Sequence, residues 1–246
     1  MATSRTGMVL NRPVFTQQRF SSASLTVLAT LIHRFTEPGA YQVTVTGGGT
    51  TRVDSVNVAA AGAHQQVNID MSKSGNGRGS APTGRAGAGC CCEPAAGRDL
   101  VVGGVVAFYA SAGTGAYRVA VTHMGEREKR VVLDSAKTVP KGDYFALTLV
   151  RPGTYTITDE LSSATATVKV RVPERGRTDT EAVTLMALGE RGFEPSATEL
   201  LAGQSVVVDL GAEGRIACVL DDPDATPDPV RSGRHTFRRG REGTGV

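Results

Sequence analysis

The chain has 246 residues, of which 40% are hydrophobic, 5% aromatic and 21% charged, with 30 glycines and no tryptophan. This length suffices for one large domain or two small ones, with a core built mainly from valine, leucine and alanine. The formal net charge of +3 is too small to indicate a polyanion partner by itself. No stretch approaches the roughly 20 apolar residues that a membrane-spanning helix needs.

The first apolar segment, Ser24 to Ile32 (SLTVLATLI), is the best candidate for a signal peptide. The residues after it, HRFTEPG, contain no small-residue cleavage site, and the alternating apolar pattern continues into later segments. We therefore predict a strand over Leu25–Phe35, no signal peptide, and a soluble cytoplasmic protein.

An internal repeat is the clearest signal in the chain. Residues 36–58 (TEPGAYQVTVTGGGTTRVDSVNV) align without a gap on residues 150–172 (VRPGTYTITDELSSATATVKVRV). The gapless alignment matches Pro38, Gly39, Tyr41, Val56 and Val58 with Pro152, Gly153, Tyr155, Val170 and Val172. A proline–glycine turn followed by alternating residues predicts a β-hairpin in each copy, with both tyrosines buried at equivalent positions. The run Leu31, His33, Phe35 corresponds in the same way to Phe145, Leu147, Leu149.

Short segments of alternating pattern, separated by turns at roughly 8–12 residues, predict an all-β fold of sandwich units rather than a βαβ fold. A Gly/Ala/Arg-rich stretch with almost nothing to bury predicts a flexible linker that joins two sandwiches. The predicted segments are an N-terminal β unit (1–71), the linker with its cysteine triplet (72–98), a central β-sandwich (99–173), a C-terminal β segment (174–222) and a disordered basic tail (223–246). We expect the C-terminal segment to complete the N-terminal unit, within one chain or between chains; the alternative is that each segment has its own small fold.

Two stretches resemble the cupredoxin-like β-sandwich. RPGTYTI (151–157) followed by TATVKV (165–170) is similar to the closing hairpin of that family, and GFEPSATELLAGQSVVVDL (192–210) is similar to its opening strands. Immunoglobulin-like and carboxypeptidase-regulatory-like sandwiches share the Pro-Gly-x-Tyr hairpin, so these fold types stay open. The resemblance implies a fold without a blue-copper site, because the loops 46–49 and 158–164 contain no cysteine, histidine or methionine.

Three adjacent cysteines, Cys90, Cys91 and Cys92, lie in the linker. Neighbouring thiolates suit Cu(I) or Zn(II), so these three are the predicted ligands if the protein binds a metal. Disulfides, or no chemical role, are the alternatives, because no second cysteine pair completes a zinc shell. Cys218 alternates with apolar neighbours and is predicted to be a buried, inert thiol.

The tail carries most of the local excess of positive charge. Its arginines predict contact with a polyanion, or otherwise a solvated tail. They are Arg231, Arg234, Arg238, Arg239 and Arg241.

No hydrolase elbow, phosphate loop, dinucleotide fingerprint or zinc-protease motif occurs in the sequence, and the four histidines are scattered. We expect a non-enzymatic interaction or assembly protein without a cofactor, a structural subunit of a larger complex or particle. It would form homo- or hetero-oligomers through sheet edges and termini. The alternatives are a soft-metal or thiol-redox protein that uses Cys90–Cys92, and an enzyme whose site the sequence hides.

Overall fold

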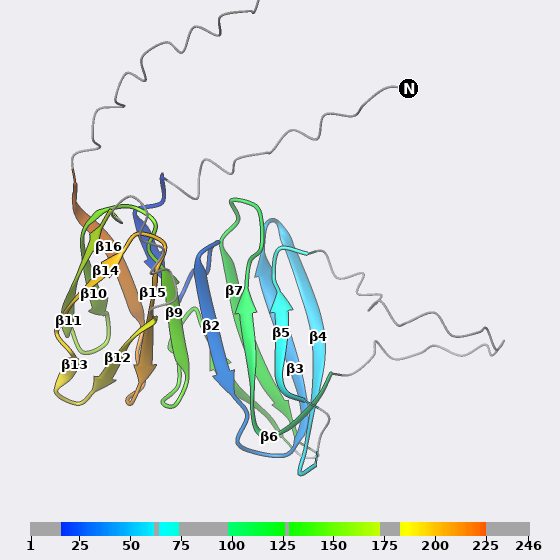
Figure 1. The fold of residues 1–246 in the computed structure, drawn as a ribbon. Helices are drawn as coiled ribbons and strands as arrows, with labels where there is room; N and C mark the ends of the chain where they lie inside the picture. Colours follow the sequence, from blue (N-terminus) through cyan, green and yellow to red (C-terminus); the bar gives the residue numbers. More distant parts are fainter. Residues whose placement is uncertain (1–15, 62–63, 74–97, 126–127, 173–182, 225–246) are drawn as a thin grey trace, which may run out of the picture.

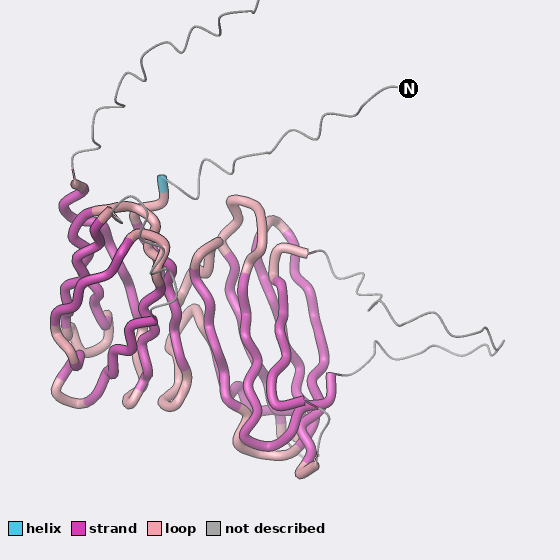
Figure 2. Tube along the Cα trace, in the orientation of Figure 1, coloured by secondary structure: helices cyan, strands magenta, loops and turns pink. Residues whose placement is uncertain are grey.

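The computed structural model describes residues 16–61, 64–73, 98–125, 128–172 and 183–224. These residues form sixteen strands joined by turns and loops (Figure 2), so the predicted all-β class is confirmed. None of the described segments contains a helix with the length and apolar character needed to cross a membrane.

The strands gather into two units that stand side by side in Figure 1. The first unit contains β2 (Ala29–Arg34), β3 (Gly39–Gly47), β4 (Thr50–Ala59), β5 (His64–Asp70), β6 (Arg98–Tyr109), β7 (Tyr117–Met124) and β8 (Lys129–Asp134). The second unit contains β9 (Tyr144–Thr148), β10 (Gly153–Asp159), β11 (Thr165–Arg171), β12 (Val183–Gly189), β13 (Gly192–Glu194), β14 (Ala197–Leu201), β15 (Ser205–Leu210), β16 (Ile216–Pro223) and, from the other end of the chain, β1 (Arg19–Ser21).

Each unit has two layers, which is consistent with a β-sandwich. In the second unit β13-β12-β15-β9 form one layer and β14-β11-β10-β16-β1 form the other. In the first unit β6 belongs to both layers, because its start pairs with β4 and its end pairs with β2 and β5. The inward-facing residues of every layer alternate with outward-facing ones, and together they make one continuous apolar core.

The repeated hairpins are β3–β4 and β10–β11, and their tyrosines are equivalent as predicted. Tyr41 and Tyr155 are both buried. Each hydroxyl donates a hydrogen bond to the carbonyl four residues earlier, on Glu37 at 2.8 Å and on Arg151 at 2.9 Å. The buried hydroxyls therefore have partners, and each fixes the turn that leads into its strand.

The gapless alignment is wrong by two residues after the hairpin turns. Val56 lies opposite Tyr41, whereas Val168 lies opposite Tyr155. The equivalent of Val56 is therefore Val168 and not Val170, and Val172 is exposed. The reason is that the strands of the first hairpin are longer, which adds two residues between the tyrosine and its partner.

The repeat extends beyond the hairpins to the whole unit. Gly103 of β6 donates its N–H to the carbonyl of Phe35, and Gly203 between β14 and β15 donates to the carbonyl of Leu149. Before Gly103, β6 pairs in parallel with β4, just as β14 pairs with β11. After Gly103, β6 pairs in parallel with β5, just as β15 pairs with β12. The single strand β6 therefore corresponds to the pair β14 and β15.

The first strand of each repeat crosses to the neighbouring unit. β8 pairs with β7 in the first unit, and β1, its equivalent, pairs with β16 in the second. Ser22 and Ser135 follow these strands and make the same contacts. Each serine donates its N–H to a carbonyl and accepts the N–H of that same residue on its hydroxyl, which is Ile216 for Ser22 and Val119 for Ser135. The N-terminal strand thus closes the unit formed by the C-terminal half of the chain.

The two units meet where β2 and β9 pair antiparallel. This pairing is centred on Leu31 opposite Phe145, which are equivalent residues of the repeat. A ladder centred on equivalent residues is two-fold symmetric, so the repeats are related as the subunits of an isologous dimer are. One layer therefore continues from β13 across the junction into the first unit.

Strand pairing crosses the boundaries that the sequence predicted. The range 99–173 is divided, since β6–β8 pair in the first unit and β9–β11 in the second. Among the described residues, strand pairing joins the 174–222 segment to the N-terminal unit where β16 pairs with β1. The arrangement of two sandwiches joined by the linker is not confirmed, because the residues on either side of the linker, in β5 and β6, pair with each other. Most of the linker and tail lies outside the described residues.

Candidate functional site

The strand β12 has an open edge with apolar side chains. It pairs with β15 over Val183–Leu188, but β13 pairs with it only over Ala187–Gly189. Among the described residues, the first four of β12 therefore have no strand on their second side. Val183 is 63% exposed and Leu185 is 58% exposed. An unpaired strand edge with apolar side chains is a template for pairing with another strand.

The equivalent strand β5 provides an internal comparison. The pairing of β5 with β6 and of β12 with β15 makes Gln66 the equivalent of Val183, and Asn68 the equivalent of Leu185. Gln66 donates its amide Nε2–H to Oδ1 of Asn68 at 2.9 Å. The same position in the fold is thus polar and internally hydrogen-bonded in the first repeat, and apolar in the second.

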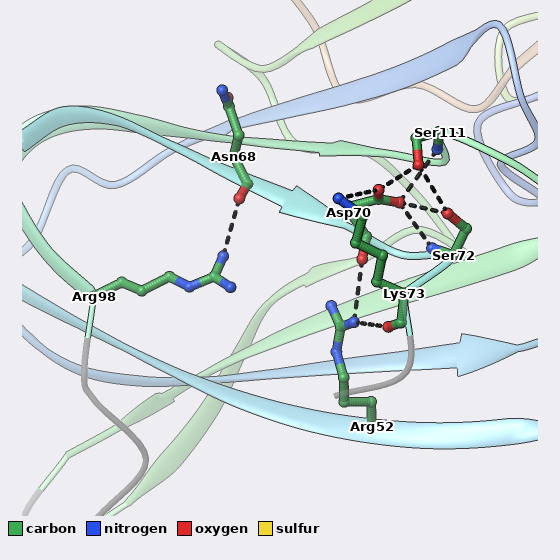
Figure 3. Close-up of polar contacts among 7 residues, drawn as sticks. All are labelled: Arg52, Asn68, Asp70, Ser72, Lys73, Arg98 and Ser111. Carbon is green, nitrogen blue, oxygen red and sulfur yellow. Dashed lines mark hydrogen bonds and ion pairs between the residues drawn. The ribbon is translucent and has the colours of Figure 1, made fainter. Parts of the chain in front are cut away.

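Two arginines also donate hydrogen bonds to backbone carbonyls of β5 and of the turn after it (Figure 3). Arg98 donates to the carbonyl of Asn68 at 3.0 Å, and Arg52 donates to the carbonyls of Asp70 and Lys73. Side-chain donors of this kind take the acceptors that an added strand would need. Their equivalents beside β12 are Thr198 and Ala164, which carry no such charge.

A carboxylate clamp closes the end of β5. Asp70 accepts hydrogen bonds from the N–H and hydroxyl of Ser72 and from the N–H and hydroxyl of Ser111, and Lys73 Nζ lies 3.5 Å from it. Burial raises the cost of ionising this group, but the hydrogen bonds from Ser111 and Ser72 outweigh burial and lower the pKa of Asp70. The equivalent position in β12 is Ala187. The hydrogen bonds from Ser72 and Ser111 therefore fix the end of β5 in place.

The substitution Asp70→Asn should destabilise the protein by about 2 kcal/mol at neutral pH, since charge-assisted hydrogen bonds are lost. The pKa of Asp70 is lower in the folded protein than in the unfolded chain, where it is about 4. The ionised carboxylate therefore stabilises the fold fully above about pH 4, and this contribution is lost as the pH falls through the pKa of the folded state. The difference in unfolding free energy between wild type and variant should therefore shrink below about pH 4. Denaturant unfolding at several pH values measures this, with Asp99→Asn, on the exposed start of β6, as the control. If the difference in unfolding free energy stayed constant down to about pH 2, ionisation of Asp70 would not be the source of the stabilisation.

A buried histidine–aspartate pair lies where the two units meet. Nδ1 of His33 in β2 lies 2.7 Å from Oδ2 of Asp143, just before β9, and Oδ1 of Asp143 accepts the N–H of Arg34. Both side chains are buried. The ring of His33 also packs edge-on against Phe35, with 4.7 Å between the ring centroids. This pair lines a cleft between the units.

The predicted metal ligands Cys90, Cys91 and Cys92 lie outside the described residues, as do the five arginines of the tail. Both sites stay predictions. Within the described segments, no three histidine, cysteine, aspartate or glutamate side chains are grouped so that they would hold a metal ion. Cys218 is buried as expected, and burial raises the pKa of its thiol to about 12, with Asp221 adding to the effect.

No family model, curated protein sequence or solved structure matches this chain. The β-sandwich class therefore stands on the strand pairing described above, without a family to specify its type.

Sequence reasoning missed both the β12 edge and the His33–Asp143 pair. The edge had a visible signal, because V-x-L-x-A (183–187) and Q-x-N-x-D (66–70) alternate with the same period. The histidine and aspartate are 110 residues apart and meet only through the β2–β9 pairing. No local pattern connects them.

Proposed function

We propose that this protein is a non-enzymatic interaction module that assembles through the open edge of β12, and that its partner there is a second copy of the chain. The observation that carries the proposal is the contrast between two equivalent strands. β5 has polar side chains and arginine-capped carbonyls, whereas β12 has exposed Val183 and Leu185. A fold that tolerates polar residues at one copy of a position does not need apolar ones at the other.

A second copy is favoured as partner because the chain already joins its own repeats in this way. β2 and β9 form a symmetric antiparallel ladder between equivalent strands. Two β12 edges can form a ladder of the same kind, with the same patch on both sides, as two-fold dimers do. The protein would then be a structural subunit of a complex, built from sandwiches of the cupredoxin-like or immunoglobulin-like type.

The double substitution Val183→Gln, Leu185→Asn tests the proposal, since it installs the residues of β5. We expect the wild type to sediment as a dimer at micromolar concentration and the variant to dissociate at least about tenfold more readily, because the apolar contact is lost. Analytical ultracentrifugation over a concentration series gives both dissociation constants.

Val53→Gln and Val131→Gln are matched controls, because both valines are more than half exposed on other strands. They should leave the dimer intact. A wild type that stays monomeric up to about 100 µM would overturn self-assembly, since that concentration already corresponds to only 5–6 kcal/mol of binding free energy. A dimer that the β12 variant forms as tightly as wild type would place the interface elsewhere.

A further inference from the structure

The cleft between the two units has the size of a small-ligand site. Its volume is about 390 Å³, and its walls come from the end of β2 and the turn after it, from β3, from β8, and from the loop before β9. Pockets that hold small molecules begin at about 300 Å³ and often lie where two domains meet. Its charged and titratable lining residues include His33, Arg34, Glu37, Arg130, Lys141 and Asp143.

The other repeat has apolar residues where this cleft has its histidine–aspartate pair. The pseudo-two-fold relation places Leu147 at the position of His33 and Ala29 at the position of Asp143, and these two lie opposite each other in the β2–β9 ladder. By the same relation, Val27 is the equivalent of Lys141, and Thr148 is the equivalent of Arg34. An apolar pair therefore fills one end of the junction, and a histidine–aspartate pair fills the other. Because a buried ion pair is often no more stabilising than apolar residues of similar volume, the polar pair is a candidate for a use other than folding.

The second ring nitrogen of His33 is not used by the contact with Asp143. Asp143 engages Nδ1, and Nε2 has no hydrogen bond to any described residue. Across the described residues, no buried side-chain nitrogen or oxygen lacks a hydrogen-bond partner. The side chain of His33 is 6% exposed and lines the cleft, which is where a ligand could reach Nε2. A carboxylate on one ring nitrogen fixes the orientation in which the other meets a ligand.

One cation of the cleft is available to a ligand. Lys141 is exposed and forms no ion pair with another described residue. Arg34 alternates with His33 along β2, and its guanidinium is held by Tyr144, 5.9 Å from the ring centroid and hydrogen-bonded to the hydroxyl; Tyr144 does not line the cleft. Arg130 also lines the cleft, but Glu37 neutralises it at 2.6 Å. The positive charge available to a ligand is therefore at Lys141.

We propose that this cleft binds a small organic carboxylate that carries a second polar group. The carboxylate pairs with the ammonium group of Lys141, which is one of its usual partners. The second polar group, a hydroxyl or another carboxyl, hydrogen-bonds Nε2 of His33 inside. Burial of this Nε2 by the ligand distinguishes the site from a surface cluster of cations.

Isothermal titration calorimetry of the full chain with malate, citrate and succinate tests the proposal, with inorganic phosphate as a separate arm. We expect saturable binding of at least one carboxylate at one site per chain. Lys141→Val should weaken it about tenfold, because a charge-assisted contact is lost. The double variant His33→Leu, Asp143→Ala should abolish it. Both variants copy the residues that the other repeat carries, and thermal unfolding checks that the double variant folds, since Asp143→Ala removes the acceptor of the Arg34 N–H.

Nuclear magnetic resonance of the His33 ring adds a readout that surface charge would not move. The ¹⁵Nε2 signal of His33 should shift on binding, whereas that of exposed His64 should not. Absence of saturable binding by all three carboxylates would overturn the proposal, as would binding that both variants retain. Phosphate binding as tightly as the carboxylates, with the same sensitivity to the variants, would overturn the assignment to carboxylates. The Val183→Gln, Leu185→Asn variant should bind the ligand normally, which separates this site from the proposed assembly edge.

Discussion

The substitution Phe20→Ala should destabilise the second unit by about 3–5 kcal/mol, the range for truncating a buried phenylalanine. Phe20 lies in the middle of β1, opposite Cys218, and is 2% exposed. The strand β1 has only three residues, so Phe20 supplies most of its buried apolar surface. Its loss leaves a cavity against β16 and weakens the closure of the unit by the N-terminus.

Native-state hydrogen exchange separates this effect from a general loss of stability. In Phe20→Ala the amides of β10 and β16 should lose protection, whereas those of β3 and β7 should keep it. The matched variant is Leu133→Ala, because Leu133 is the equivalent residue on β8 and is equally buried. It should give the reverse pattern, with the first unit affected. Equal loss of protection in both units for both variants would show that the units do not open separately.

The sequence allowed the all-β class and the repeated hairpins to be predicted, because both depend on short-range signals. Alternation of apolar residues and the Pro-Gly-x-Tyr turn are readable within a few residues, and Tyr41 and Tyr155 occupy the positions that they indicate. The alignment failed where the hairpins differ in length. A gapless comparison has no means of detecting two added residues in a ladder.

The exchange of β1 and β8 was beyond sequence reasoning, because pairing partners are set by tertiary contacts. By order in the chain, β1 precedes the first unit, yet Phe20 packs in the second. The low-complexity linker misled the domain division for a related reason. A long connection lacking apolar residues is compatible with separate domains and equally with two neighbouring strands of one layer, as β5 and β6 are.

The repeat is most informative where its two copies differ. Shared features such as the tyrosine hydroxyl contacts show what the fold requires. Positions where one copy is apolar and the other polar are free of that requirement, as at β5 and β12 and at the two ends of the β2–β9 ladder. The proposed assembly edge and the proposed carboxylate site both lie at such positions, which is why residues of the other repeat serve as their test substitutions.

The substitution Gly153→Ala should destabilise the protein by about 3 kcal/mol or more, and Gly39→Ala, at the equivalent turn, by about 1–2 kcal/mol. Both glycines have φ between +141° and +144°, which an L-residue adopts only with strain, so both variants share this cost. The surroundings differ. A Cβ on Gly153 would lie 2.5 Å from the carbonyl oxygen of Asp222 and 2.9 Å from Cα of Pro223, both backbone atoms of β16.

A Cβ on Gly39 would instead collide with the imidazole of His123, a side chain at the end of β7 that can rotate away. Backbone atoms of a paired strand can move only if the β10–β16 ladder shifts, so the second cost is large for Gly153 and small for Gly39. Urea unfolding of both variants measures the two losses, and the double variant Gly39→Ala, His123→Ala checks whether the imidazole is the source of strain. Equal losses for Gly39→Ala and Gly153→Ala would mean that backbone conformation alone sets the cost and that the closeness of β16 contributes nothing.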